Sequence, residues 1–318
     1  MLHNYQTKDF GNRIRNIRKG MNLSQQDVSE LSGVNLDTLR KIENGYVVPR
    51  YDTLEILSIT YRTDLLEIFK NYRFTADLYE LYNMLDRYIV DYQVDKLKDI
   101  KDKINNLDGE VYSMVILASE INKLELLVDA IYYFNQSEKE PQKKSLLQTA
   151  MDKLIQAIMV HNEDFKLEKV TSYKFNYFDV RILVIMAVVL RKMGKGEKSN
   201  EILLFVLEIV DKSSHAPFLE KLLVIKIIAN ISYNFYSVDD HENTIKYSDL
   251  GITYAQDNNL MYGLSLLFWR KGIAQKIMGI EGFMRNMERS INILDIQGNQ
   301  QLKELYLKIL KERYEIEL

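Results

Sequence analysis

The stretch SQQDVSELSGVNLDTLRKIENGYVVP, residues 24–49, decides the fold of the first part of the chain. Ser24 can cap a helix with its hydroxyl, and Asp27 lies three residues further on, where it completes a capping box. Gly33 ends this short helix, and Asn35 can cap the next one. Two short helices around a glycine-containing turn predict a helix-turn-helix.

Apolar residues predict which side of each short helix faces the core. Val28 and Leu31 are expected to form the inward face of the first helix. Leu39, Ile42 and Tyr46 fall on one side of the second helix at helical spacing. Each helix is therefore expected to bury one apolar stripe.

Polar side chains gather on the opposite side of the second helix. Asp37, Lys41 and Asn44 share that outer face, and Arg40 flanks it. Gly45 then ends the helix, as a C-terminal glycine in left-handed conformation does. This side is expected to remain in solvent.

Helical spacing also marks the segments on either side of this unit. Apolar residues recur every three or four positions before it, and further apolar residues after it indicate two more small helices. These residues are Phe10, Ile14, Ile17 and Met21 before the unit, and Leu54, Leu57, Leu65, Leu66 and Phe69 after it. A domain of five helices is therefore predicted for residues 1–70.

This domain resembles the repressor-type helix-turn-helix family, often called XRE or lambda-repressor-like. The resemblance rests on Ser24-Gln25, Gly33, the string IENG at residues 42–45, and Pro49. It implies that the domain binds double-stranded DNA, with Gln25 and Asn44 on the phosphate backbone. A helical adaptor that does not bind DNA is the structural alternative.

The same resemblance places four residues of the second short helix at base-facing positions. Lys41 or Arg40 can donate to guanine O6 and N7, Asp37 can accept from cytosine N4, and Leu36 can contact a thymine methyl group. Asp37 could also repel wrong sequences, or it could simply stabilise the first turn of its helix. The candidate DNA-binding residues are Gln25, Asn35, Leu36, Asp37, Thr38, Arg40, Lys41, Asn44 and Arg50.

A local basic cluster lies within the formal net charge of −3. It could contact phosphate, although a solvated helix face has the same composition. The cluster consists of Lys8, Arg13, Arg15, Arg18 and Lys19, opposed there by Asp9.

From residue 71 to residue 318, helix-length apolar segments alternate with short polar breaks. The segment at residues 190–210 resembles the segment at residues 274–294, with Gly194 and Gly279 in corresponding turns. The repeating unit is a helix pair of roughly forty residues, close to the length of tetratricopeptide and HEAT-type units. We expect a right-handed α-solenoid of tetratricopeptide-like pairs, about five in number, with Gly272 at a close-packing position. The whole chain is thus predicted to be all-α.

One helix of this region, predicted over residues 218–236, carries polar side chains on a mostly apolar background. Lys226, Asn230, Tyr233 and Asn234 fall within one sector, and their amides could bind an extended peptide backbone. A solvent-facing stripe explains the spacing equally well. Further candidates on inner helices are Asn176, Tyr177, Tyr262 and Trp269, and core packing is the alternative for the aromatic residues.

A repressor-type domain followed by a degenerate tetratricopeptide array is similar to the RRNPP group of peptide-pheromone-responsive regulators, which includes Rgg, PlcR and ComR. The resemblance implies a cytoplasmic homodimer in quorum sensing that binds two DNA half-sites and a short signalling peptide. The alternative is a phage-type repressor, or a DNA-tethered protein-interaction scaffold, with no peptide ligand.

Several classes of protein are disfavoured by composition. The absence of cysteine excludes disulfides, thiolate zinc sites and a cysteine nucleophile. The N-terminus lacks the apolar core of a signal peptide, and the longest apolar run, residues 182–190, is too short to span a membrane. The four histidines have no paired metal-binding spacing, so neither an enzyme nor a cofactor is expected. They are His3, His161, His215 and His241.

Overall fold

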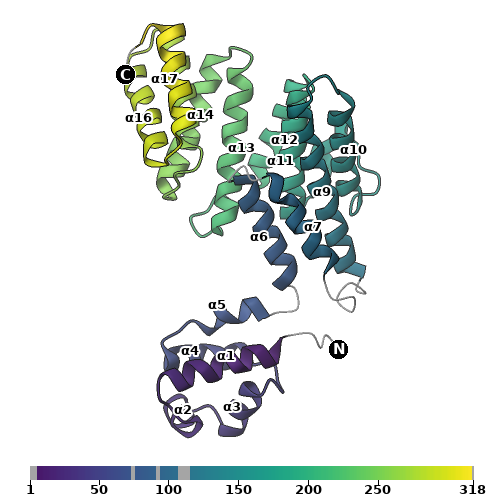
Figure 1. Ribbon diagram of the computed structural model, residues 1–318, viewed down its shortest axis with the longest axis vertical. Coiled ribbons are helices and arrows are strands. Elements are labelled where there is room, and N and C mark those ends of the chain that lie inside the picture. The colour runs from purple at the N-terminus through teal and green to yellow at the C-terminus, as the bar shows by residue number, and fades with distance from the viewer. Residues whose placement is uncertain (1–5, 73–75, 91–93, 107–114, 317–318) are drawn as a thin grey trace. The chain divides into compact units, whose positions relative to one another are not determined.

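The computed structural model describes residues 6–72, 76–90, 94–106 and 115–316, and its regular elements within these ranges are helices, with no strand (Figure 1). The chain divides into two compact units, Met1–Ile121 and Asn122–Leu318. The predicted all-α class is confirmed. The predicted end of the DNA-binding domain at residue 70 stays a prediction.

Five helices form the beginning of the first unit, as predicted. A 3-10 turn, η1 (Lys70–Tyr72), follows them, and α6 (Ala76–Val90), η2 (Val94–Lys96) and α7 (Leu97–Asn105) come next. The first five are α1 (Thr7–Gly20), α2 (Gln25–Ser32), α3 (Leu36–Glu43), α4 (Tyr51–Tyr61) and α5 (Leu65–Phe69).

The predicted caps of α2 and α3 are present. The Ser24 hydroxyl accepts from the Asp27 backbone N–H at 3.0 Å, and the Asp27 carboxylate accepts from the Ser24 N–H at 2.7 Å. Asn35 Oδ1 accepts from the backbone N–H of Asp37 at 2.8 Å, which starts α3. Gly45 has φ +72°, a conformation that L side chains rarely adopt, so the chain leaves α3 at this point.

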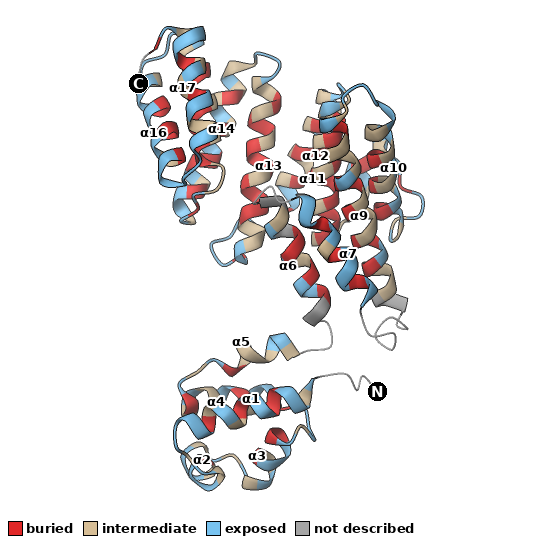
Figure 2. Ribbon diagram, in the orientation of Figure 1, coloured by how far each residue is buried: buried red, intermediate tan, exposed pale blue. Residues whose placement is uncertain are grey.

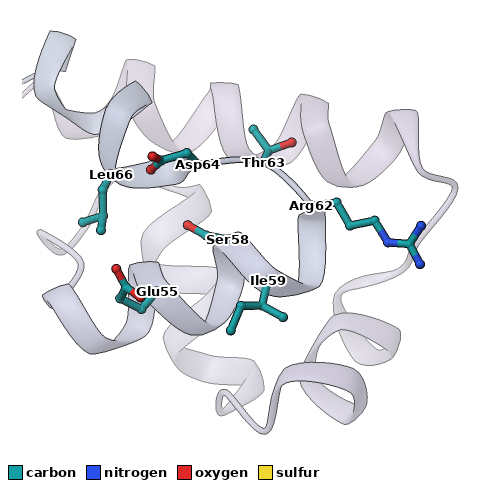
Figure 3. A pocket seen from close by; sticks show the side chains of 7 residues that line it. All are labelled: Glu55, Ser58, Ile59, Arg62, Thr63, Asp64 and Leu66. Atoms are coloured by element: carbon teal, nitrogen blue, oxygen red, sulfur yellow. The ribbon is translucent and has the colours of Figure 1, made fainter. Parts of the chain in front are cut away.

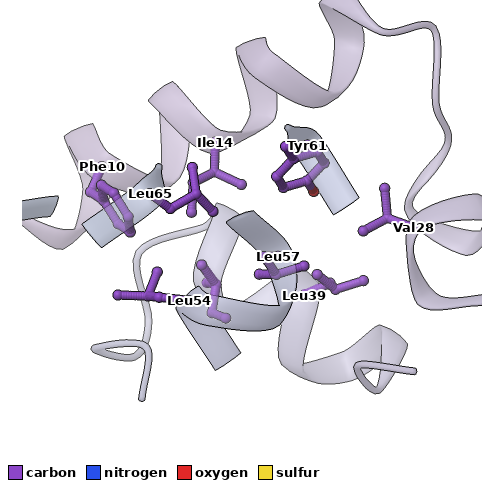
Figure 4. Close-up of a cluster of buried hydrophobic side chains, with 9 residues drawn as sticks. Phe10, Ile14, Val28, Leu39, Leu54, Leu57, Tyr61 and Leu65 are labelled. Carbon is purple, nitrogen blue, oxygen red and sulfur yellow. The ribbon is translucent and has the colours of Figure 1, made fainter. Parts of the chain in front are cut away.

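Nine buried side chains form the core between these helices (Figure 4). They are Phe10, Ile14, Val28, Leu39, Ile42, Leu54, Leu57, Tyr61 and Leu65. Two predicted inward residues are not among them, because Leu31 is 68% exposed and Tyr46 is 78% exposed. α2 buries only Val28 along its short length. The left-handed turn at Gly45 breaks the helical period before Tyr46.

The second unit contains helices of similar length joined by short connections. In this unit lie most of α9 (Val115–Lys139), then α10 (Ser145–Met159), η3 (Leu167–Ser172), α11 (Tyr177–Lys192), α12 (Gly196–Ile209), α13 (Phe218–Tyr236), α14 (His241–Asp257), α15 (Leu264–Ile277), α16 (Phe283–Ile296) and α17 (Gln300–Tyr314). Buried residues recur along α11 and α13, as the red segments of Figure 2 show.

The helix pairs α11–α12, α13–α14 and α15–α16 show the predicted repeat. Their members pack against each other, and α13 also contacts α11 and α15, so the first helices of successive pairs are neighbours. Gly194 and Gly279 occupy corresponding turns with φ +81° and +68°. A Cβ at Gly272 would lie 3.0 Å from Met287 Sδ, so this glycine does allow α15 and α16 to pack closely.

A fully buried ion pair joins α9 to α11. Lys123 Nζ lies 2.5 Å from Asp179 Oδ1, and both side chains are buried. The other Asp179 oxygen accepts from the Asn176 N–H at 3.0 Å. One carboxylate therefore fixes both the α9–α11 contact and the start of α11.

Candidate nucleic-acid interface and ligand-binding face

The predicted DNA-binding residues lie on the solvent side of α2, α3 and the start of α4. None of the nine is buried. The exposed ones are Asn35, Asp37, Arg40, Lys41, Asn44 and Arg50, and the half-buried ones are Gln25, Leu36 and Thr38. This arrangement agrees with the outer face predicted for α3.

Two of the predicted base-contacting residues pair with each other. Lys41 Nζ lies 2.7 Å from Asp37 Oδ2, and the two side chains are 52% and 67% exposed. Exposed pairs of this kind contribute only about 0–1 kcal/mol, so DNA could separate them at low cost. Arg40 has no ion pair with any of the described residues and is available to a base or phosphate.

Glu43, on α3, connects its helix to α1 and α2. Its carboxylate accepts from Arg18 Nε at 2.6 Å and from Arg18 Nη2 at 2.9 Å, and it also accepts from Gln25 Nε2 at 2.8 Å. The Gln25 amide keeps a second N–H that can donate to a phosphate. α1, α2 and α3 are thus held in one arrangement by a buried carboxylate.

Sequence analysis missed this connection and placed Arg18 in a basic surface cluster. Arg18 is buried, because its guanidinium turns inward to Glu43. The only signal was Glu43 within the IENG string, whose role there was not assigned. Arg15, also in the cluster, donates to Asn44 Oδ1 at 2.7 Å, which leaves the Asn44 amide nitrogen free to donate outward.

Acidification is expected to loosen this arrangement. Burial raises the pKa of Glu43, but the hydrogen bonds from Arg18 and Gln25 outweigh it and hold the pKa below the usual 4.5. Since the folded pKa lies below the unfolded pKa, the stabilisation is complete above pH 4.5 and is lost as pH falls through the folded value.

The measurement is hydrogen exchange of α1–α3 amides in wild type and Glu43→Gln as pH is lowered from neutrality. After correction for intrinsic exchange rates, Glu43→Gln should be less protected at neutral pH and should lose less protection on acidification. Parallel pH profiles for the two proteins would contradict the assignment.

A shallow hollow lies between α4 and α5 of the same unit (Figure 3). It contains no residue of α3. Its Ser58 hydroxyl donates to the Leu54 carbonyl at 2.7 Å and accepts from the Leu65 N–H at 2.9 Å, so this group already has its partners. The lining residues are Glu55, Ser58, Ile59, Arg62, Thr63, Asp64 and Leu66.

In the second unit, three of the four predicted ligand residues on α13 are half-buried, namely Lys226, Asn230 and Tyr233. Lys226 Nζ lies 5.6 Å from the ring centroid of Tyr262, which brings two predicted residues together. Asn230 Nδ2 donates to the Lys226 carbonyl at 2.8 Å, so its Oδ1 faces away from that bond. Lys226, Asn230, Tyr233 and Tyr262 are all half-buried.

Two other predicted residues lie in the core. Asn234 donates to Ser199 Oγ and to Asn200 Oδ1, both at 2.8 Å, and so joins α13 to α12. Trp269 is buried and its ring stacks on that of Tyr306 with centroids 3.8 Å apart. Their surroundings favour packing roles.

Asn176 caps α11, and its side-chain hydrogen bond lies at the start of α11 rather than with the residues of α13. Its side chain accepts from the Asp179 N–H at 2.9 Å, and its neighbour Tyr177 packs under Arg181, whose guanidinium carbon is 4.3 Å from the ring centroid. Asn176 is exposed, so a ligand can reach it.

The structure adds two arginines that the sequence did not single out for this face. Arg191 from α11 and Arg270 from α15 both lie against the ring of Tyr233. In the sequence, Arg191 is only the charged residue that follows the apolar run at residues 182–190. Arg270 follows Trp269, and spacing along the sequence does not show that it meets α13.

Across the described ranges, no group of three or more histidine and carboxylate side chains could hold a metal ion. The helices within those ranges include none with the length and apolar character needed to cross a bilayer.

Sequence comparison identifies the first unit's helix-turn-helix. Residues 14–68 match the family model described as helix-turn-helix. The match covers α2 and α3 and confirms the predicted XRE-type domain. No curated protein matches the chain by sequence.

Three solved structures share the fold over nearly the whole chain. PlcR of Bacillus thuringiensis, in complex with the peptide PapR7 and DNA, is 16% identical with a TM-score of 0.65, and the match covers 94% of this chain and 99% of that chain. The SHP pheromone receptor Rgg2 of Streptococcus dysgalactiae is 13% identical with a TM-score of 0.55, covering 96% and 100%. ComR of S. thermophilus, in complex with DNA and its signalling peptide ComS, is 16% identical with a TM-score of 0.52, covering 93% and 97%.

These likenesses establish the architecture of a helix-turn-helix followed by a helical-repeat region. Of these proteins, Rgg2 is a pheromone receptor, and PlcR and ComR were solved in complex with DNA and a peptide.

Proposed function

We propose that this chain is a cytoplasmic transcription regulator that binds DNA through α3 and is controlled by a short signalling peptide bound to its helical-repeat unit. The observation that carries the proposal is the helix-turn-helix at residues 14–68 within a fold that matches PlcR, solved with peptide and DNA, over 94% of the chain. We further propose quorum sensing as the context.

DNA binding is proposed to use a homodimer on two half-sites. A single short helix in the major groove contacts few base pairs, and dimers of helix-turn-helix proteins place two such helices about one helical turn of DNA apart. The exposed Arg40 and the Asp37–Lys41 pair would then face bases, while Gln25 and Asn44 would contact phosphates.

Peptide binding is proposed at the face shared by α11, α13 and α15. Asn230 has an oxygen free to accept a peptide N–H. Lys226 and Tyr233 on the same helix, and Tyr262 against Lys226, add half-buried polar and aromatic groups. Asn176 would contact the ligand at the start of α11. Helical-repeat proteins bind ligands on such faces because successive first helices line one concave surface.

Control of DNA binding requires that the peptide prefer one dimer arrangement. Equal affinity for both arrangements would shift nothing, however tightly the peptide binds. Coupling of about 1–3 kcal/mol, several-fold to a hundredfold in affinity, is the usual scale for such linkage.

Substitutions should separate base contacts from phosphate contacts. Lys41→Ala is expected to relax sequence preference at one position of each half-site, whereas Gln25→Ala should weaken binding to all sites alike. The measurement is binding to a cognate site and to its single-base variants at fixed salt. Equal losses on cognate and scrambled DNA would remove Lys41 from the base-contacting set.

Asn230→Ala is expected to weaken peptide binding about tenfold, since it removes a hydrogen bond to the ligand backbone. Asn258→Ala is the matched control. Asn258 lies at the end of α14, and its Nδ2 donates to the carbonyl four residues earlier, that of Tyr254, at 3.0 Å, as Asn230 does to Lys226. Isothermal titration with the peptide gives the two affinities. Undiminished affinity in Asn230→Ala would exclude this residue.

The proposal as a whole is tested by a DNA-binding curve of the purified protein on its own upstream DNA, with and without the small-peptide fraction of its host's culture. Salt must be fixed, because phosphate contacts make affinity strongly salt-dependent. A peptide-dependent shift supports the proposal. Tight binding that ignores the peptide favours the phage-type repressor or scaffold, and no binding in either condition contradicts DNA recognition itself.

A further inference from the structure

Tyr233 on α13 is held between two arginines from neighbouring helices. The guanidinium carbon of Arg191, on α11, lies 4.2 Å from the ring centroid, and that of Arg270, on α15, lies 4.9 Å from it. Three helices thus bring two cations to one aromatic ring. An aromatic face attracts guanidinium groups but does not neutralise their charge.

Neither arginine has a carboxylate partner among the described residues. Arg270 Nη1 donates to the Ala229 carbonyl at 2.5 Å, and Arg191 Nε is buried without a hydrogen-bond partner there. The described residues supply neither guanidinium with an ion pair. Both side chains are only partly exposed, so water cannot fully solvate them.

The pKa of Arg270 also reflects positive charge that is not balanced by a nearby carboxylate among the described residues. Burial lowers the pKa of Arg270 to about 10, and the charge of Arg191 contributes in the same direction. Two guanidinium groups of like charge therefore share a partly desolvated face. Such an arrangement is costly unless an anion joins it.

The two buried cations among the described residues, Arg18 and Lys123, have their counter-charge built in. Arg18 pairs with Glu43 in the first unit, and Lys123 pairs with Asp179 in the second. Arg191 and Arg270 have no such carboxylate among the residues that the structure describes, and they lie beside Tyr233 on the face proposed for the peptide. The missing counter-charge is therefore one that a ligand can bring.

We propose that Arg191 and Arg270 together bind a carboxylate of the peptide ligand, with Tyr233 holding the two guanidinium groups in place. Guanidinium groups form paired, charge-assisted hydrogen bonds with carboxylates, and these are stronger than neutral ones. The inference rests on the proposed function and narrows its ligand to a peptide whose carboxylate enters this face. That carboxylate is either the C-terminus or an acidic side chain.

The probe is a synthetic heptapeptide library prepared with free C-terminal carboxylates and, separately, as C-terminal amides. Each form is made with and without Asp and Glu at the randomised positions. Peptide retained by the full-length wild-type protein is quantified for the four pools. If the protein binds the peptide's C-terminus, it should retain both pools with a free C-terminal carboxylate about tenfold more than both amide pools. If it binds an acidic side chain, it should retain both pools that contain Asp and Glu more than the two that lack them, by a similar factor.

Arg191→Gln and Arg270→Gln should each abolish the preference, whereas Arg289→Gln should keep it. Arg289 is the matched control because its guanidinium carbon also lies against a ring, 5.3 Å from that of Phe268, but on α16 outside the face. Trp269 fluorescence checks that each variant is folded, since this buried residue is the only tryptophan in the chain.

The outcomes separate this inference from the proposed function. Equal retention of all four pools by wild type leaves peptide binding in place and overturns the carboxylate site. A preference that survives in folded Arg191→Gln and Arg270→Gln also overturns it. No retention of any pool overturns peptide binding and this inference together.

Discussion

Replacing Gly11 by alanine is expected to unfold the helix-turn-helix while leaving the second unit folded. Gly11 is buried where α1 crosses the end of α3, and a Cβ there would lie 2.4 Å from the Ile42 carbonyl oxygen and 2.7 Å from that of Glu43. Both neighbours are backbone, so the strain can be relieved only by separating α1 from α3. We expect a loss of about 3 kcal/mol or more, at the upper end of overpacking effects.

Gly20→Ala is the matched control, since Gly20 lies at the end of the same helix with nothing within 4 Å of its Cβ position. It should leave stability unchanged or raise it slightly, because alanine favours helix over glycine. Hydrogen exchange of α1–α5 measures the difference, and Trp269 fluorescence reports the second unit separately. Equal protection of α1–α5 in the two variants would show that α1 and α3 can move apart without cost.

Replacing Lys123 by methionine is expected to destabilise the second unit by about 3–5 kcal/mol, because it leaves a buried carboxylate without its counter-charge. Lys123 is fully buried, contacts Asp179 at 2.5 Å, and lies 3.1 Å from His161 Nδ1. Since Asp179 also caps α11 through Asn176, the damage should extend to the start of the proposed ligand face.

The control is Lys192→Met, which removes an exposed pair between the same two helices. Lys192 lies 2.7 Å from Glu138, with side chains 40% and 46% exposed, so a change of about 0–1 kcal/mol is expected. Urea unfolding followed by Trp269 fluorescence gives both values. Adding Asp179→Asn to Lys123→Met should recover part of the loss, because it removes the stranded charge while keeping an oxygen for the cap. Similar midpoints for Lys123→Met and Lys192→Met would refute the role of the buried pair.

The parts of the fold that the sequence predicted are those set by nearest neighbours along the chain. Ser24 and Asp27 form their capping box within three residues, and Gly45 ends α3 through its own backbone angle. Gly194 and Gly279 mark equivalent turns for the same reason. Such features need no knowledge of what packs against them.

Predictions that depended on a distant partner were less successful. Helical spacing put Leu31 on an inward face, but its side chain is 68% exposed. The same kind of spacing grouped Asn234 with Lys226 and Asn230, and it did not show that Asn234 bonds to Ser199 and Asn200 of α12. Arg18 was assigned to a basic surface cluster because its partner, Glu43, lies 25 residues away. Periodicity assigns a residue to a side of its helix, but it does not say what lies opposite.

The sequence by itself determined the helices, their caps and turns, the repeat and the outer face of α3, because local backbone preferences and spacing decide these features. Tertiary structure alone decided which charges are paired. Lys123 meets Asp179 across 56 residues, and Arg191 and Arg270 meet at Tyr233 with no carboxylate partner among the described residues. Such contacts depend on how whole helices pack, and packing is fixed by the shape and burial of the complete fold rather than by any one segment.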